Sequence, residues 1–87
     1  MNGKAGHWIQ VTISSGMFSS EKAVELKLAD GRKVSFFADN NLLEERAGRS
    51  YLKVTLVNSD PGQKTDLVLL PSETFETASP WAEVPAA

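Results

Sequence analysis

The sequence of 87 residues contains no cysteine. Small secreted domains usually carry disulfide bonds, because a short chain buries too little apolar surface to be stable without them. We therefore expect a reducing intracellular compartment, the cytoplasm. The same absence excludes thiol nucleophiles, iron–sulfur clusters and zinc sites built from cysteine.

Long apolar runs are also missing. No stretch approaches the roughly 20 apolar residues that a membrane-spanning helix requires, so we expect no membrane association. Residues 1–6 contain one lysine, but the apolar segment that follows the positive charge in a signal peptide is missing, so we expect no signal peptide. We expect these residues to form a flexible N-terminus.

The sequence also lacks a large excess of either charge. It has 9 Lys and Arg and 11 Asp and Glu, which give a net charge of −2. This balance argues against nucleic acid as the partner, because phosphate binding usually needs a basic surface. Hydrophobic residues make up 41% and charged residues 23%, as in a folded globular domain. The length allows one domain, so 1–87 is predicted to be a single β domain.

Four segments place an apolar residue at every second position, the pattern of a β-strand with one buried face. They cover residues 9–14, 24–28, 33–38 and 52–56. A helix would instead need apolar residues three and four positions apart. A fifth segment, 67–70, is apolar without alternation and is predicted to be a strand covered on both faces.

The link between the second and third segments predicts a particular loop. A three-residue loop at 29–31 pairs Leu26 with Val34, so that apolar side chains share a face. It also places Gly31 where a left-handed residue forms a bulge. A two-residue loop would set a leucine opposite a lysine.

The next hairpin is predicted around residues 60–63. Pro61 followed by Gly62 suits the centre of a type II turn, because proline fixes a negative φ and glycine accepts a positive one. Pairing about this centre sets Leu56 against Leu67.

Between the third and fourth segments, residues 39–48 predict one or two helical turns. An Asp or Asn can cap the start and Gly48 can end the turns. Leu42 and Leu43 are expected to close one end of the core. After residue 70, the segment 71–87 is predicted to dock on the body, with a short last strand at 81–84 and a frayed end.

These elements predict an all-β fold, a small antiparallel barrel or roll of five to six strands with one short helical turn. The order of elements fits both an SH3-like roll and an OB-like barrel. We favour the SH3-like description, because the strands are short and the chain ends in a turn followed by a strand. Fold analogy of this kind does not assign a function.

Nothing in the sequence indicates catalysis, a cofactor or a metal site. His7 is the only histidine and has no cysteine or second histidine for a shared metal, so we expect a structural or exposed role. The adjacent pair Glu44 and Glu45 would not converge on one point in a helical turn. No glycine-rich phosphate loop or nucleophile elbow is present. We therefore expect a protein that is not an enzyme.

Five apolar or aromatic residues are candidates for binding a partner. Met17 and Phe18 lie in a polar loop, where they could contact a partner or plug an end of the barrel. Phe37 and Tyr51 point outward near Lys and Arg and could stack on single-stranded nucleic acid, or could lie beneath 71–87. Trp81 belongs to the acidic end, which is either a linear motif or a docked tail.

Two functions follow from these candidates. The one we favour is a small protein-interaction module or accessory subunit that binds another protein. The alternative is single-stranded nucleic-acid binding through the aromatic and basic face. The oligomeric state is left open by both.

Overall fold

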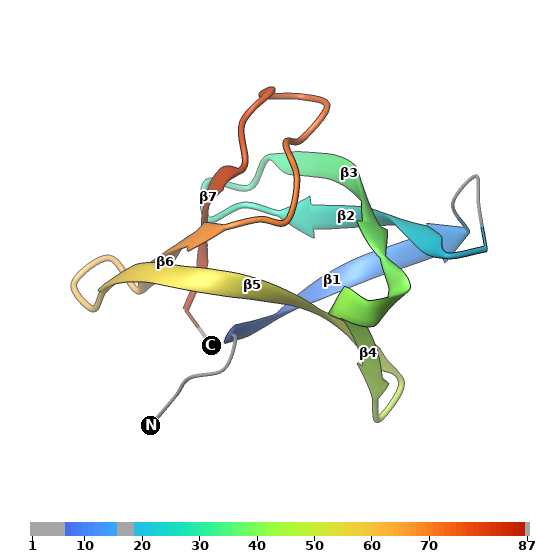
Figure 1. Cartoon of the computed structure of the whole chain (residues 1–87). Helices are drawn as coiled ribbons and strands as arrows, with labels where there is room; N and C mark the ends of the chain where they lie inside the picture. Colours follow the sequence, from blue (N-terminus) through green and yellow to red (C-terminus); the bar gives the residue numbers. More distant parts are fainter. Residues whose placement is uncertain (1–6, 16–18, 87) are drawn as a thin grey trace.

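The computed structural model describes residues 7–15 and 19–86 of the chain (Figure 1). The N-terminal residues 1–6, the pair Met17 and Phe18, and the last residue Ala87 lie outside the described residues. The expectations placed on them therefore stay expectations.

Seven strands and one 3₁₀ turn make up the described part of the chain (Figure 1). All strand pairs are antiparallel. The predicted all-β antiparallel class with one short helical turn is confirmed. The elements are β1 His7–Ser15, β2 Glu21–Lys27, β3 Lys33–Asp39, η1 Asn40–Leu42, β4 Leu43–Arg46, β5 Arg49–Asp60, β6 Thr65–Leu69 and β7 Trp81–Pro85.

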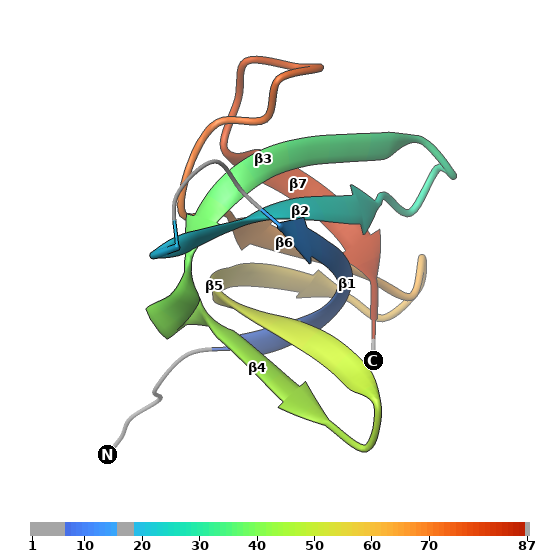
Figure 2. The same ribbon diagram turned by 90° about the vertical axis from the view of Figure 1, so that its right-hand side faces the viewer.

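The strands form one sheet that curls into a half-barrel (Figure 2). Six of them follow the order β3-β2-β1-β5-β6-β7, and β4 is an extra strand paired with β5. β1 joins the two halves of the sheet, because it pairs with β5 through residues 7–11 and with β2 through residues 12–15. No helix in the described part is long and apolar enough to cross a membrane.

The core lies on the concave face of this sheet. It is built from alternate residues of the strands, as the period of two predicts. Phe36, Leu52 and Val68 have at most 1% of their surface exposed. The other buried apolar residues are Ile9, Val11, Val24, Leu26, Leu28, Val34, Ala38, Val54, Leu70, Ala82 and Val84.

The β2–β3 hairpin has the predicted register, with Leu26 opposite Val34. The Leu28 N–H donates to the Arg32 carbonyl at 2.7 Å, which closes the three-residue loop 29–31. Gly31 has a φ of +93°. Matching the apolar faces of the two strands was therefore a sound guide to the loop length.

The predicted register of the β5–β6 hairpin is wrong. Leu56 lies opposite Val68, and Leu67 lies opposite Asn58, with a register shift between Leu56 and Asn58. Val57 is the extra residue of this bulge. Leu56 is 42% exposed, although it lies opposite the buried Val68.

The loop of this hairpin also differs from the predicted type II turn. Asp60 pairs with Thr65, so the loop has four residues, 61–64. The positive φ, 57°, belongs to Lys64 and not to Gly62. The Asp60 carboxylate accepts a hydrogen bond from the Gln63 N–H at 3.2 Å, and this contact favours the longer loop.

The helical prediction for 39–48 is correct only at its start. The Asp39 carboxylate accepts from the Asn41 N–H at 2.8 Å and caps the single turn η1. From Leu43 the chain becomes β4 instead of continuing as a helix, because a tight turn at residues 47–48 returns it along β5, whose backbone then pairs with it. Leu42 and Leu43 do pack against the core, as expected.

β6 lies between β5 and β7 in the sheet. Its residues Leu67 and Leu69 are partly buried, while Val68 on the other face is fully buried. The chain end pairs beside β6 as the strand β7, which corresponds to the short last strand expected at 81–84.

The loop between β6 and β7 covers the outer edge of β3 (Figure 1). The Ser35 N–H and hydroxyl each donate to the Glu76 carboxylate at 2.6 Å, and the Ser35 carbonyl accepts from the Phe75 N–H at 2.9 Å. An uncovered edge strand is a template for unwanted pairing with other chains. These contacts remove that hazard from β3.

We predict that Gly31→Ala lowers the free energy of unfolding by about 1–2 kcal/mol, because a side chain at this φ is strained even in open space. The matched control is Gly62→Ala, whose new Cβ would meet only Asp60 Oδ1, at 3.5 Å, and whose φ is not positive. Urea unfolding of the two variants measures the difference. Equal losses would contradict the loop geometry.

The Glu76 contacts predict a pH dependence. The Ser35 hydroxyl, and then its N–H, hold the pKa of Glu76 below its usual value of 4.5. A lowered pKa in the folded state stabilises the fold above pH 4.5, and this contribution disappears as the pH falls through the lowered value. We therefore expect Glu76→Gln to destabilise the protein at pH 7 and to cost progressively less in acid.

Denaturant unfolding between pH 7 and pH 3 tests this expectation. Glu73→Gln is the control, since Glu73 is exposed on the same loop and has no side-chain hydrogen bond to the described residues. A stability loss in Glu76→Gln that does not change with pH would show that the carboxylate charge is irrelevant to the edge contact.

Candidate functional site

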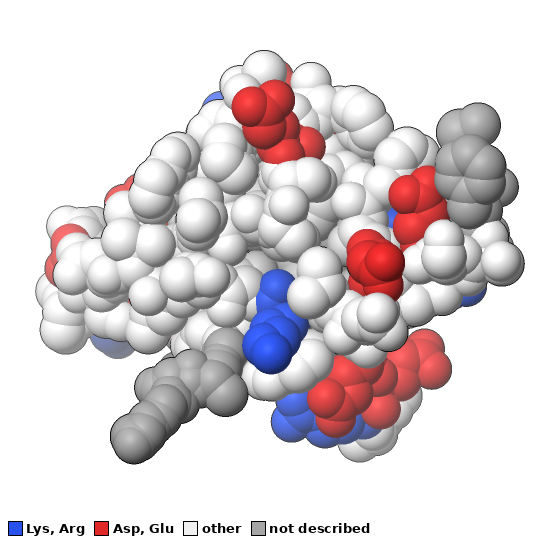
Figure 3. Space-filling view, viewed as in Figure 1, with Lys and Arg blue, Asp and Glu red and all other residues white. Residues whose placement is uncertain are grey.

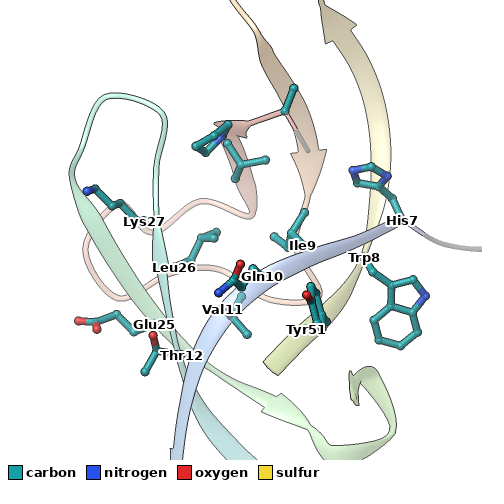
Figure 4. Close-up of a pocket in the computed structure, with 13 residues that line it drawn as sticks. His7, Trp8, Ile9, Gln10, Val11, Thr12, Glu25, Leu26, Lys27 and Tyr51 are labelled. Atoms are coloured by element: carbon teal, nitrogen blue, oxygen red, sulfur yellow. The ribbon is translucent and has the colours of Figure 1, made fainter. Parts of the chain in front are cut away.

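β1 and β2 separate beyond the pair Thr12–Glu25, which is their last. β2 ends at Lys27, and the following Ala29 N–H donates to the Glu83 carbonyl of β7 at 2.9 Å. The chain after β2 is therefore drawn toward β7 and away from the first half of β1. The separation leaves a groove of about 520 Å³ along β1 (Figure 4).

The floor of the groove is apolar and its rim is mixed. Ile9, Val11, Leu26 and Val84 line it from the core side. Glu25 and Lys27 project from β2 on one side of β1, whereas Trp8 and Tyr51 lie on the other side (Figure 4).

The backbone of β1 is open along this groove. A strand directs the N–H and C=O groups of alternate residues toward opposite edges. Residues 7–11 pair with β5 on one edge, and no other described element hydrogen-bonds to their backbone. Every second residue of this stretch therefore presents its backbone donor and acceptor to the groove.

An arginine fixes the aromatic side of the groove. The Arg46 guanidinium carbon lies 5.6 Å from the centre of the Trp8 ring and 5.0 Å from that of Tyr51, within cation–π range. Its Nε is 2.8 Å from Glu44 Oε2, which holds the guanidinium in place. Because β4 pairs with β5 next to β1, this arginine reaches both rings.

His7 closes one end of the groove and contacts a buried carboxylate. Its Nε2 is 3.5 Å from Oδ2 of Asp66, and the Asp66 side chain is only 9% exposed. Asp66 is on the same face of β6 as the core residue Val68. The single histidine thus connects β1 to a buried carboxylate of β6.

The groove offers unpaired backbone groups, an apolar floor and rigid aromatic faces. These features suit the binding of an extended polypeptide. A second hollow, of about 240 Å³ and lined by Ile13, Lys22, Leu43 and others, is smaller. Among the described residues, no three His, Asp or Glu side chains gather in a way that could hold a metal ion.

Comparison of the chain with protein-family models, with curated proteins and with solved structures gave no match.

Of the five residues proposed from sequence to bind a partner, three are described by the structure, and among these Tyr51 alone lines the groove. Phe37 instead packs edge-on against Phe75, with ring centres 5.5 Å apart. Trp81 is 52% exposed on β7, and Met17 and Phe18 lie outside the described residues.

The structure does not bring Phe37 and Tyr51 together, since β2 and β1 lie between their strands in the sheet. Arg32, one of the basic residues near Phe37 in the sequence, has its Nε 2.7 Å from Oδ2 of Asp30. On the face shown in Figure 3, Lys and Arg are scattered among Asp, Glu and neutral residues.

Trp8, Arg46 and Asp66 were missed from sequence. Trp8 could have been found, because alternation places it on the outer face of its strand beside His7. Arg46 could not, because residues 43–46 were predicted to be helical. Asp66 lies just before the apolar run 67–70, and no sequence motif or alternation singled it out.

We predict that His7→Ala lowers the free energy of unfolding by roughly 1–2 kcal/mol, because it leaves the buried Asp66 carboxylate without its partner. In an Asp66→Asn background no carboxylate charge remains, so the same substitution should cost clearly less. Denaturant unfolding of the wild type, both single variants and the double variant measures this coupling. An identical cost of His7→Ala in both backgrounds would rule it out.

Proposed function

We propose that this chain is a small protein-interaction module without enzymatic activity, which binds an extended segment of a partner protein in the groove along β1. The observation that carries the proposal is the separation of β1 from β2 after Thr12–Glu25, which leaves the edge of residues 7–11 open. A partner segment would add to the sheet at this edge.

The open edge sets the kind of ligand. When an extended peptide joins a sheet, backbone hydrogen bonds supply affinity, and pockets for alternate side chains supply specificity. The stretch of β1 from residue 7 to residue 11 extends over about 16 Å, enough for a segment of similar length. The apolar floor supplies a surface for every second side chain of such a segment.

The rim of the groove supports a protein partner over nucleic acid. Trp8 and Tyr51 offer flat surfaces, but Arg46 already contacts both rings. The opposite rim carries a single lysine, Lys27, next to the carboxylate-bearing Glu25, whereas a nucleic-acid site needs several cations for the phosphates. The other stacking candidate, Phe37, is engaged with Phe75.

The test begins with selection of binding heptapeptides from a random displayed library on the wild-type protein. We expect Trp8→Ala to weaken the selected peptides by about tenfold or more, because Trp8 forms part of the groove. Trp81→Ala is the matched control, since Trp81 is exposed on β7 and does not line the groove. Titration of each variant by fluorescence anisotropy gives the affinities.

Hydrogen exchange separates strand addition from other modes of binding. On peptide binding, alternate amides among residues 7–11 should gain protection, because they acquire carbonyl partners. The proposal would be overturned if Trp8→Ala left the affinity of the selected peptides unchanged, or if these amides gained no protection from exchange on binding. Binding of an oligo-dT strand that falls steeply with salt would favour the nucleic-acid alternative instead.

A further inference from the structure

Lys27 faces a second lysine on the β2–β3 hairpin. In the register of the two strands it lies directly opposite Lys33, and both side chains are exposed. Like charges directly opposite each other destabilise a sheet. Neither lysine forms an ion pair with the described residues.

The acidic residue nearest along the same face of β2 is Glu25. It is two positions away on the strand, and among the described residues its carboxylate forms no ion pair with Lys27. Only Lys27 of the two lysines lines the groove. The groove therefore has an exposed cation on its β2 side whose neighbours leave it uncompensated.

The register of β1 and β2 places this cation within a bound segment's reach. Their pairing ends at Thr12–Glu25, and its continuation would set Gln10 opposite Lys27. A segment that enters between the two strands has one outward side chain at this level, because residues directly opposed across a sheet share a face. That side chain lies between Gln10 and Lys27.

From this geometry we infer that the partner segment carries a carboxylate, from Asp or Glu, at the position beside Lys27. The inference rests on the proposed function and names the partner's chemistry. The next outward side chain of the segment, two positions away, lies beside Trp8 on the outer face of β1, and is apolar or aromatic. The one residue between these two positions faces the apolar floor.

The experiment uses the selected heptapeptides and, for each, a counterpart in which Asp or Glu is replaced by Asn or Gln. On the wild-type protein in low salt, the neutral counterpart should bind about two- to five-fold more weakly, the size of one cross-strand ion pair. On Lys27→Gln the acidic and neutral peptides should bind equally.

Lys33→Gln is the matched control. It removes the same charge from the same hairpin, but Lys33 does not line the groove. The preference for the acidic peptide should survive in this variant. Hydrogen exchange on the unbound variants checks that both keep the fold.

Three results would overturn the inference. Selected peptides could lack acidic residues, the neutral counterparts could bind the wild type as well as their parents, or the preference could persist in Lys27→Gln. If binding still depends on Trp8 in these cases, the groove stands as a peptide site and only its charge preference is refuted. If no peptide depends on Trp8, the proposed function fails and the inference fails with it.

Discussion

The pairing of β1 with two strands in succession is the constraint on which the rest of the molecule depends. Its first half belongs to the ladder with β5 and its second half to the ladder with β2. Because the two ladders occupy different halves of β1, this strand connects the two halves of a sheet that curls around the core. The separation from β2 that leaves the edge of β1 open is a consequence of the same division. Fold and groove thus have one origin.

The edges of this sheet differ in how they are protected from pairing with other chains. Ser35 on β3 is bonded to the β6–β7 loop on its outer side, and the Glu76 carboxylate accepts two hydrogen bonds there. β4 is short and carries exposed charged residues, which also discourages pairing. The edge of β1 at residues 7–11 has neither protection within the described structure, but it lies inside a groove instead of on the flat surface. Such a recessed edge admits a single extended chain more readily than a whole second sheet.

Sequence patterns predicted those parts of the fold that alternation determines. The faces of the first three strands and the Leu26–Val34 register follow from matching apolar residues. The β5–β6 register could not be predicted in this way, because the Val57 bulge adds a residue that no apolar pattern marks. The strand 43–46 was mistaken for a helix, because four residues carry too short a pattern and only the pairing with β5 decides their conformation. Local sequence thus fails where a tertiary contact sets the structure.

The groove depends on contacts between distant residues, which explains why sequence identified only Tyr51 of its aromatic side. Trp8, Arg46 and Tyr51 come from three strands and meet only through the ladders β1–β5 and β4–β5. In the proposed binding mode this arrangement would favour the ligand, because a guanidinium within cation–π range of both rings restricts the rotamers of the two side chains before a ligand binds. Binding to side chains that are already ordered loses less conformational entropy than binding to free ones. Arg46 is therefore expected to act on the groove through these rings, although it is outside the groove itself.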